Sequence, residues 1–165
     1  MRIYILNTTR FYHEDFEEYP GAWFSCPVDF EEVKERIGLN DEYEEYAIHD
    51  YELPFEIDEY TPIEEVNRLC EMVENLPEDI QEELSELLGY YSSLEDLCEH
   101  ADDIIHYPDC DDMTDVAYYF IDECQSLGEI PDRIRSYIDY EAYGRDLDLE
   151  GRFVVTNHGV FECPY

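Results

Sequence analysis

Lysine is almost absent from this sequence: Lys34 is the single lysine, and the 9 cationic residues face 45 aspartates and glutamates. The formal net charge at neutral pH is −36. Because a polyanion repels other polyanions, this balance excludes nucleic acid and anionic membranes as direct ligands. The sequence has no run of about 18 apolar residues, the length that could span a bilayer. It also does not open with a signal peptide, in which charged residues precede an apolar stretch. We therefore expect a soluble, cytoplasmic protein.

Cysteine and glycine are too sparse or too scattered for the common catalytic motifs. The 6 cysteines form no C-x-x-C pair. Most of them lie at apolar positions of helical patterns, which predicts buried, reduced thiols rather than disulfides. The 7 glycines build no phosphate-binding loop and no G-x-S-x-G nucleophile motif. We expect no enzymatic activity, no catalytic residue and no cofactor.

Metal binding has only weak candidates in the sequence. The zinc candidate consists of Cys98, His100, His106 and Cys110. Its spacing matches no structural zinc finger. The calcium candidate, residues 109–115, has Thr114 where an EF-hand needs glycine. The sequence therefore predicts no metal site.

The chain nevertheless has enough apolar residues to fold. Hydrophobic residues make up 44% of it and aromatic residues 15%, which excludes the intrinsic disorder that usually accompanies such a charge. Runs of β-favouring residues predict strands at 2–6, 22–26 and 46–51, with a turn-prone acidic stretch between the first two. Asp29 as N-cap and Gly38 as stop predict a short helix. We expect residues 1–60 to form a small mixed α/β domain.

The segment 61–106 is expected to form a central domain of short acidic helices. Thr61 fits an N-cap, with Pro62 as the first helical residue and Glu64 completing a capping box. Two further helices are expected from Pro77 to Gly89 and from Ser92 to Pro108.

Residues 107–165 are expected to form a C-terminal α+β domain. Two helices are predicted there, one over about 112–127 with Gly128 as its stop, and one from Pro131 to Ile138. A terminal hairpin of strands 152–156 and 160–163 completes the domain. The fold class predicted for the whole chain is α+β.

The acidic residues are organised along the chain. Between Ile37 and Asp132 the sequence has 31 acids and a single cation, Arg68. On the predicted helices these acids lie opposite the apolar stripe, and solubility alone needs a net charge of only about 2–8. At the duplex density of one charge per ~1.7 Å, 36 charges would cover about 60 Å of DNA. Carboxylates on such helices could therefore stand where phosphates stand in DNA.

The residues themselves leave two alternatives open for the origin of the charge. A halophilic protein would also be acidic and poor in lysine. A chaperone for basic proteins is the second alternative, although its acids usually form runs or disordered tails.

The aromatic residues near the end of the chain suggest an interface between two copies. Aromatic residues are enriched at interface centres, and charged residues are depleted there. The proposed interface residues are Tyr118, Tyr119, Tyr137, Tyr140 and Tyr143.

Three segments carry a resemblance to a known family. They are the opening RIYILN with Gly21-Ala22-Trp23, the string YEEYAIHDYE at Tyr43–Glu52, and above all YIDYEAYGRD at Tyr137–Asp146. With the acidic, lysine-poor composition, these segments resemble the ArdA antirestriction proteins. The resemblance implies an elongated, three-part α+β protein that dimerises and imitates bent duplex DNA. It also implies that the chain occupies the DNA-binding groove of Type I restriction–modification enzymes and protects an incoming mobile element.

The sequence thus leads to a specific functional hypothesis. We expect a non-enzymatic DNA mimic that binds the methyltransferase core of a Type I enzyme as a homodimer. The alternative is an acidic binding module or chaperone for basic, histone-like host proteins. The expected phosphate substitutes are Glu64, Glu65, Glu71, Glu74, Glu78, Asp79, Glu82, Glu83, Glu86, Glu95, Asp96, Glu99, Asp102 and Asp103.

Overall fold

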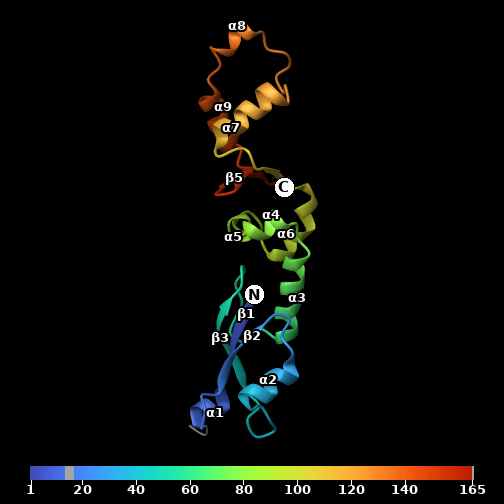
Figure 1. The fold of residues 1–165 in the computed structure, drawn as a ribbon, viewed down its shortest axis with the longest axis vertical. Helices are drawn as coiled ribbons and strands as arrows, with labels where there is room; N and C mark the ends of the chain where they lie inside the picture. Colours follow the sequence, from blue (N-terminus) through green and yellow to red (C-terminus); the bar gives the residue numbers. More distant parts are fainter. Residues whose placement is uncertain (14–16, 165) are drawn as a thin grey trace. The chain divides into compact units, whose positions relative to one another are not determined.

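The computed structural model describes residues 1–13 and 17–164. The chain divides into two compact units, Met1–Leu76 and Pro77–Tyr165. In the described residues each unit combines helices with an antiparallel sheet of three strands (Figure 1). The predicted α+β class is therefore confirmed. The three-domain division into 1–60, 61–106 and 107–165 stays a prediction.

The first unit is built around β1 (Arg2–Asn7), which pairs with β2 (Gly21–Ser25) on one side and β3 (Tyr46–Glu52) on the other. All three strands lie where the sequence predicts them. Alternate residues of β1 point into the core, and Ile3 and Ile5 are fully buried. Helix α2 (Phe30–Ile37) adds Val33 to the same core.

The caps of α2 follow the sequence prediction. The side chain of Asp29 accepts a hydrogen bond from the N–H of Glu31 at 2.9 Å, and Gly38 has a left-handed φ of 70°. The acidic stretch between β1 and β2 differs from the prediction, because it contains α1 (Thr8–His13). The cause is Asn7, a fully buried residue whose side chain accepts the N–H of Arg10 at 3.0 Å. Residues 14–16 of that stretch lie outside the described residues.

Helix α3 (Ile63–Glu74) completes the first unit. Its predicted capping box is wrong: Pro62 is the N-cap residue and makes no side-chain cap bond. The Thr61 hydroxyl is used elsewhere, since it accepts the N–H of Asp58 at 3.0 Å in the preceding turn. The inward face of α3 consists of the buried residues Ile63, Val66, Cys70 and Val73.

The second unit begins with short helical segments. They are α4 (Glu78–Glu82), α5 (Leu84–Leu87), η1 (Leu88–Tyr90), α6 (Leu94–His100) and η2 (Ala101–Asp103). The single helix predicted from Pro77 to Gly89 is interrupted at Glu83, whose φ and ψ are −107° and 18°. The N-cap of α6 is Ser93, one residue after the predicted Ser92, because its side chain accepts the N–H of Asp96.

The second sheet has the order β4-β6-β5. The hairpin of β5 (Phe153–Thr156) and β6 (Gly159–Glu162) confirms the prediction. The third strand, β4 (Ile105–Tyr107), replaces the predicted end of the helix that was expected to reach Pro108. Its residues pair with β6, with His106 opposite Phe161. This distant pairing overrides a local helical pattern in a β-branched segment.

The remaining helices of the second unit are α7 (Met113–Tyr118), the π-helical turn η3 (Tyr119–Glu123), α8 (Asp132–Arg135) and α9 (Tyr140–Leu149). The predicted helix to residue 127 ends early because Gln125 adopts a positive φ of 50°. The helix from Pro131 stops at Arg135, and α9 starts as a separate helix after its cap, Asp139. Within the described residues, no helix is both long and apolar enough to cross a bilayer.

Candidate functional site

Most of the expected phosphate substitutes have exposed side chains. Because each helix turns its apolar stripe inward, the carboxylates on the opposite face meet solvent. In the first unit they lie on α3, and in the second on α4, α5, α6 and η2. The exposed members of the set, all among the described residues, are Glu64, Glu71, Glu74, Glu78, Glu82, Glu86, Glu99, Asp102 and Asp103.

Four members are half-buried, and they include Glu65, Asp79 and Asp96. Glu65 accepts two hydrogen bonds from the Arg68 guanidinium, at 2.8 and 2.6 Å. Asp96 accepts the N–H and the hydroxyl of Ser92 at 2.9 and 2.8 Å, and these bonds lower the pKa of Asp96. The fourth is Glu95.

Glu83 does not fit the predicted role. It lies at the break between α4 and α5, is only 5% exposed, and its carboxylate contacts Nδ1 of His158 in the hairpin turn. This contact raises the pKa of His158. A buried carboxylate engaged by its own chain cannot meet a partner, so Glu83 is removed from the set.

The same region contains a polar network that the sequence did not reveal. His106 of β4 has its Nδ1 3.0 Å from Oδ2 of Asp79 and its Nε2 2.9 Å from the carbonyl oxygen of His158. Its ring stacks on Phe161 with a centroid distance of 4.1 Å. Histidines far apart in the sequence are brought together only by the β4–β6 pairing, so local patterns could not identify them.

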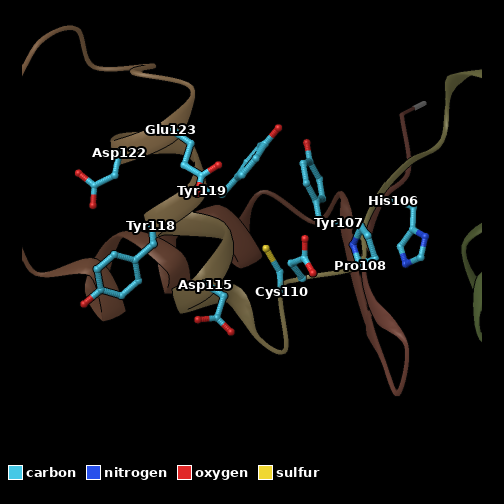
Figure 2. A pocket seen from close by; sticks show the side chains of 10 residues that line it. His106, Tyr107, Pro108, Cys110, Asp115, Tyr118, Tyr119, Asp122 and Glu123 are labelled. Atoms are coloured by element: carbon cyan, nitrogen blue, oxygen red, sulfur yellow. The ribbon is translucent and has the colours of Figure 1, made fainter.

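A hollow of about 540 Å³ lies beside α7 and η3. Figure 2 shows its wall: Tyr107 and Cys110 come from β4 and the following loop, while Asp115, Tyr118, Tyr119, Asp122 and Glu123 come from the helix and the π-helical turn. The sequence pattern at residues 109–115 suggested only a calcium loop and gave no sign of this hollow.

The hollow holds a concentration of negative charge. Burial, followed by the charges of Asp115, Asp109 and Glu123, raises the pKa of the Cys110 thiol. Among the acids that line the hollow, Asp122 has its negative charge balanced, because its carboxylate pairs with Arg135 and accepts a hydrogen bond from the Tyr140 hydroxyl at 2.9 Å. A hollow with carboxylates beside tyrosine rings suits a cationic group, through Coulomb attraction and cation–π contact.

The tyrosines expected at a dimer interface divide into two groups. Tyr118, Tyr119 and Tyr137 are exposed, Tyr137 by 84%. Tyr140 is only 9% exposed and its ring stacks on Tyr118, while Tyr143 packs against the core of the second unit. The rings of Tyr140 and Tyr143 therefore pack within their own unit, which leaves them less accessible to a second copy than the other three, and the interface itself stays a prediction.

Residues 1–13 and 17–164 bring together no group of three His, Cys, Asp or Glu side chains able to hold a metal ion. In the zinc candidate, the ring nitrogens of His100 and His106 already face Asp96 and Asp79.

The comparisons with known proteins bear on the family. No curated protein matches the chain. The family model described as "Antirestriction protein (ArdA)" matches residues 12–162, which is nearly the whole sequence. The match includes both the exposed acidic helices and the YIDYEAYGRD segment. The chain belongs to the ArdA antirestriction protein family.

Proposed function

We propose that this chain inhibits Type I restriction–modification enzymes by presenting carboxylates in place of DNA phosphates, as a homodimer. Family membership supports the antirestriction function. The observation that carries the mechanism is the exposure of acids in a segment almost without cations. Between Ile37 and Asp132 there are 31 acids and one cation, and that cation, Arg68, is itself bound to Glu65.

Each unit contributes its own exposed acids to the proposed contacts, from α3 in the first unit and from α4, α5, α6 and η2 in the second. A DNA-binding groove is lined by Lys and Arg side chains that neutralise phosphates. The same side chains can pair with carboxylates, and the counterions held by the acidic helices are released on binding. Affinity should therefore fall steeply with salt, as it does for DNA.

The hollow beside α7 adds a shaped site to this surface. Asp109, Asp115 and Glu123 line it, together with the rings of Tyr118 and Tyr119. A guanidinium or ammonium group of the target enzyme would gain charge pairing and ring contact there at once. The hollow would therefore be one site of defined shape among acids that are otherwise spread over the helices.

The homodimer is proposed to form through Tyr137, a large exposed aromatic of the second unit, because Tyr118 and Tyr119 line the hollow that is proposed to meet the target enzyme. Arg133, Arg135 and Arg145 lie in the same part of the sequence. The repulsion between two copies is therefore lowest there. Sedimentation of Tyr137→Ser against the parent protein tests this part separately.

The decisive experiment is a competition assay. A fluorescent duplex is bound to a Type I methyltransferase core, and the chain is added in increasing amounts at two salt concentrations. The proposal expects displacement at stoichiometric amounts and a weaker effect at high salt. No displacement, combined with tight binding to a histone-like protein, would favour the alternative of an acidic module for basic proteins.

Matched variants separate the effect of where the acids lie from the effect of the net charge. E64Q/E71Q/E74Q neutralises the exposed acids of α3, whereas E35Q/E42Q/E56Q neutralises three exposed acids elsewhere in the same unit. Both variants lose the same charge. The α3 variant should displace DNA less well than the control, and equal loss in the two variants would contradict a defined contact surface.

A further inference from the structure

His106 connects α4 with the terminal hairpin through its imidazole ring. The residue belongs to β4 and lines the hollow beside α7 (Figure 2). One ring nitrogen, Nδ1, is 3.0 Å from Oδ2 of Asp79 in α4. The other, Nε2, is 2.9 Å from the carbonyl oxygen of His158 in the turn between β5 and β6. All these groups belong to the second unit.

Packing fixes the position of this ring. It stacks on the ring of Phe161, with 4.1 Å between the ring centroids and an angle of 3° between the planes. Phe161 is itself fully buried in β6. On the side of the turn, Gly159 leaves room for the imidazole, because a Cβ built on Gly159 would lie 2.9 Å from Nε2 of His106. The ring is therefore held with its two nitrogens toward the two oxygens.

Both oxygens that face the ring can only accept hydrogen bonds. An ionised carboxylate and a main-chain carbonyl have no proton to donate. A neutral imidazole donates from one nitrogen and presents a lone pair on the other, whereas the imidazolium donates from both. The neutral ring of His106 can therefore make one of the two hydrogen bonds, and the imidazolium can make both.

The charged groups around His106 come from every element packed against it. Asp79 faces the ring from α4, and Glu162 of β6 accepts the hydroxyl of the next residue along β4 at 2.8 Å. The imidazole of His158 has its own acid, because its Nδ1 contacts Glu83, and this contact raises the pKa of His158. The hollow contributes four acids, one of them paired with an arginine: Asp109, Asp115, Glu123 and the pair Asp122–Arg135. These surroundings are mainly acidic, so they attract a positive charge on the ring.

We propose that His106 is a proton-operated link between α4 and the terminal hairpin. While the ring holds two protons, Nδ1–H donates to Asp79 and Nε2–H donates to the carbonyl oxygen of His158. When one proton is lost, the remaining N–H stays on the stronger acceptor, which is the carboxylate of Asp79. The lone pair of Nε2 then faces the carbonyl oxygen, and the turn of the hairpin is released.

The link would operate near neutral pH, because histidine is the side chain that gains or loses its charge between about pH 5 and 8. Its contribution to stability is complete while the ring is charged and is lost as the pH rises and the ring becomes neutral. The inference concerns the second unit alone and does not depend on the proposed DNA mimicry.

Asp79→Asn reverses the proton requirement. In the parent chain the other carboxylate oxygen, Oδ1, accepts the N–H of Ile80 at 3.0 Å. An asparagine keeps its oxygen on that N–H, so its NH₂ group takes the place of Oδ2 and points at Nδ1 of His106. This amide suits a neutral ring, because Nδ1 accepts from the amide while Nε2–H donates to the carbonyl oxygen of His158. It opposes the imidazolium, because two donors would then meet.

Urea unfolding of the full-length chain at two pH values tests the link. At about pH 5.5 the midpoint of Asp79→Asn should lie about 0.5 M below that of the parent chain, and at about pH 8.5 it should be equal or higher. The pair of Glu83 and His158 is present in both chains, so its own pH dependence cancels. Glu78→Gln removes the same charge from an exposed residue of α4 and should show no such reversal. An equal loss for Asp79→Asn at both pH values, or no loss at either, would overturn the proposal.

Nitrogen NMR of the histidine rings locates the protons directly. In a chain labelled with ¹⁵N-histidine, the signals of His106 are identified by their contacts with the ring of Phe161. In the parent chain both ring nitrogens should be protonated at about pH 5.5, and the remaining proton should lie on Nδ1 at about pH 8.5. In Asp79→Asn at about pH 8.5 it should lie on Nε2 instead. The same tautomer in both chains, or an unprotonated nitrogen in the parent chain at about pH 5.5, would show that the link does not exist.

Discussion

Gly144 lies in the middle of α9, within the YIDYEAYGRD segment, and it lets this helix approach the first turn of α7. A Cβ built on Gly144 would lie 2.7 Å from the carbonyl carbon of Met113 and 3.0 Å from the nitrogen of Thr114. Both obstacles are main-chain atoms at the start of a capped helix. They cannot rotate away as the tip of a side chain could. The Gly144→Ala variant must therefore push α7 and α9 apart.

The cost can be worked from these contacts. Overpacking a tight site costs about 1–3 kcal/mol, and rigid obstacles place Gly144→Ala in the upper part of that range. Alanine in a helix interior recovers about 0.5–1 kcal/mol relative to glycine. The expected net loss is about 2 kcal/mol, close to a 30-fold shift in the folding equilibrium. With a typical urea slope of about 2 kcal/mol/M, the midpoint should fall by about 1 M.

Gly89→Ala is the matched control, because a Cβ at Gly89 meets nothing within 4 Å. That change should leave stability equal or raise it by up to about 1 kcal/mol, by restricting the unfolded chain. Urea unfolding followed by circular dichroism measures both variants. If Gly144→Ala unfolds at the same midpoint as the parent chain or above it, the close approach of α9 to α7 is not what this glycine provides.

Three further outcomes are expected. Glu83→Gln should lower stability below about pH 6 and have less effect near pH 9, because the raised pKa of His158 makes the contribution of the pair complete at low pH and progressively lost as pH rises through that pKa. Glu82→Gln, at the exposed neighbouring residue, should show no such trend in urea unfolding. An equal loss of stability at both pH values for Glu83→Gln would contradict the assignment. Asn7→Ala should lower the free energy of unfolding by about 3 kcal/mol, because it leaves the Arg10 N–H and the carbonyl oxygens of Ile37 and Gly38 without their side-chain partner. A change under about 1 kcal/mol in the same assay would argue against the importance of these three hydrogen bonds. The melting temperature of the parent chain should rise from low to moderate salt, because screening relieves repulsion among the acids; calorimetry that gives a constant value would mean that they are already compensated.

The sequence predicted those parts of the fold that depend on local patterns. The strands of the first sheet, the terminal hairpin and the caps of α2 all follow from alternation, turn residues and the pair Asp29 and Gly38. The stripe of α3 likewise followed from helical spacing. These features are specified by residues close together in the chain, so periodicity was sufficient to find them.

The errors occurred where a distant partner decides the conformation. Residues 105–107 fit a helical stripe, and only the pairing with β6 makes them a strand. On the uninterrupted helix that the sequence predicts, Glu83 would face outward. The break between α4 and α5 instead turns its carboxylate toward His158. Tyr140 shares its spacing with exposed tyrosines, yet Asp122 and Tyr118 hold it in the core. The helical spacing therefore predicted which acids are exposed, while their role as a contact surface stays a prediction. The hollow was missed because it exists only after the second unit has folded.

The pairing of β4 with β6 also orders events during synthesis. All strands of the first sheet have left the ribosome soon after residue 52, so that sheet can form while translation continues. In the other sheet, β6 is the central strand and includes residues 159–162. Residues 105–107 must therefore wait for more than fifty later residues before their main-chain groups find strand partners. A nascent chain stopped near residue 150 would have a complete first sheet, while residues 105–107 would still lack a strand partner. A protease or a chaperone would encounter the chain in this state.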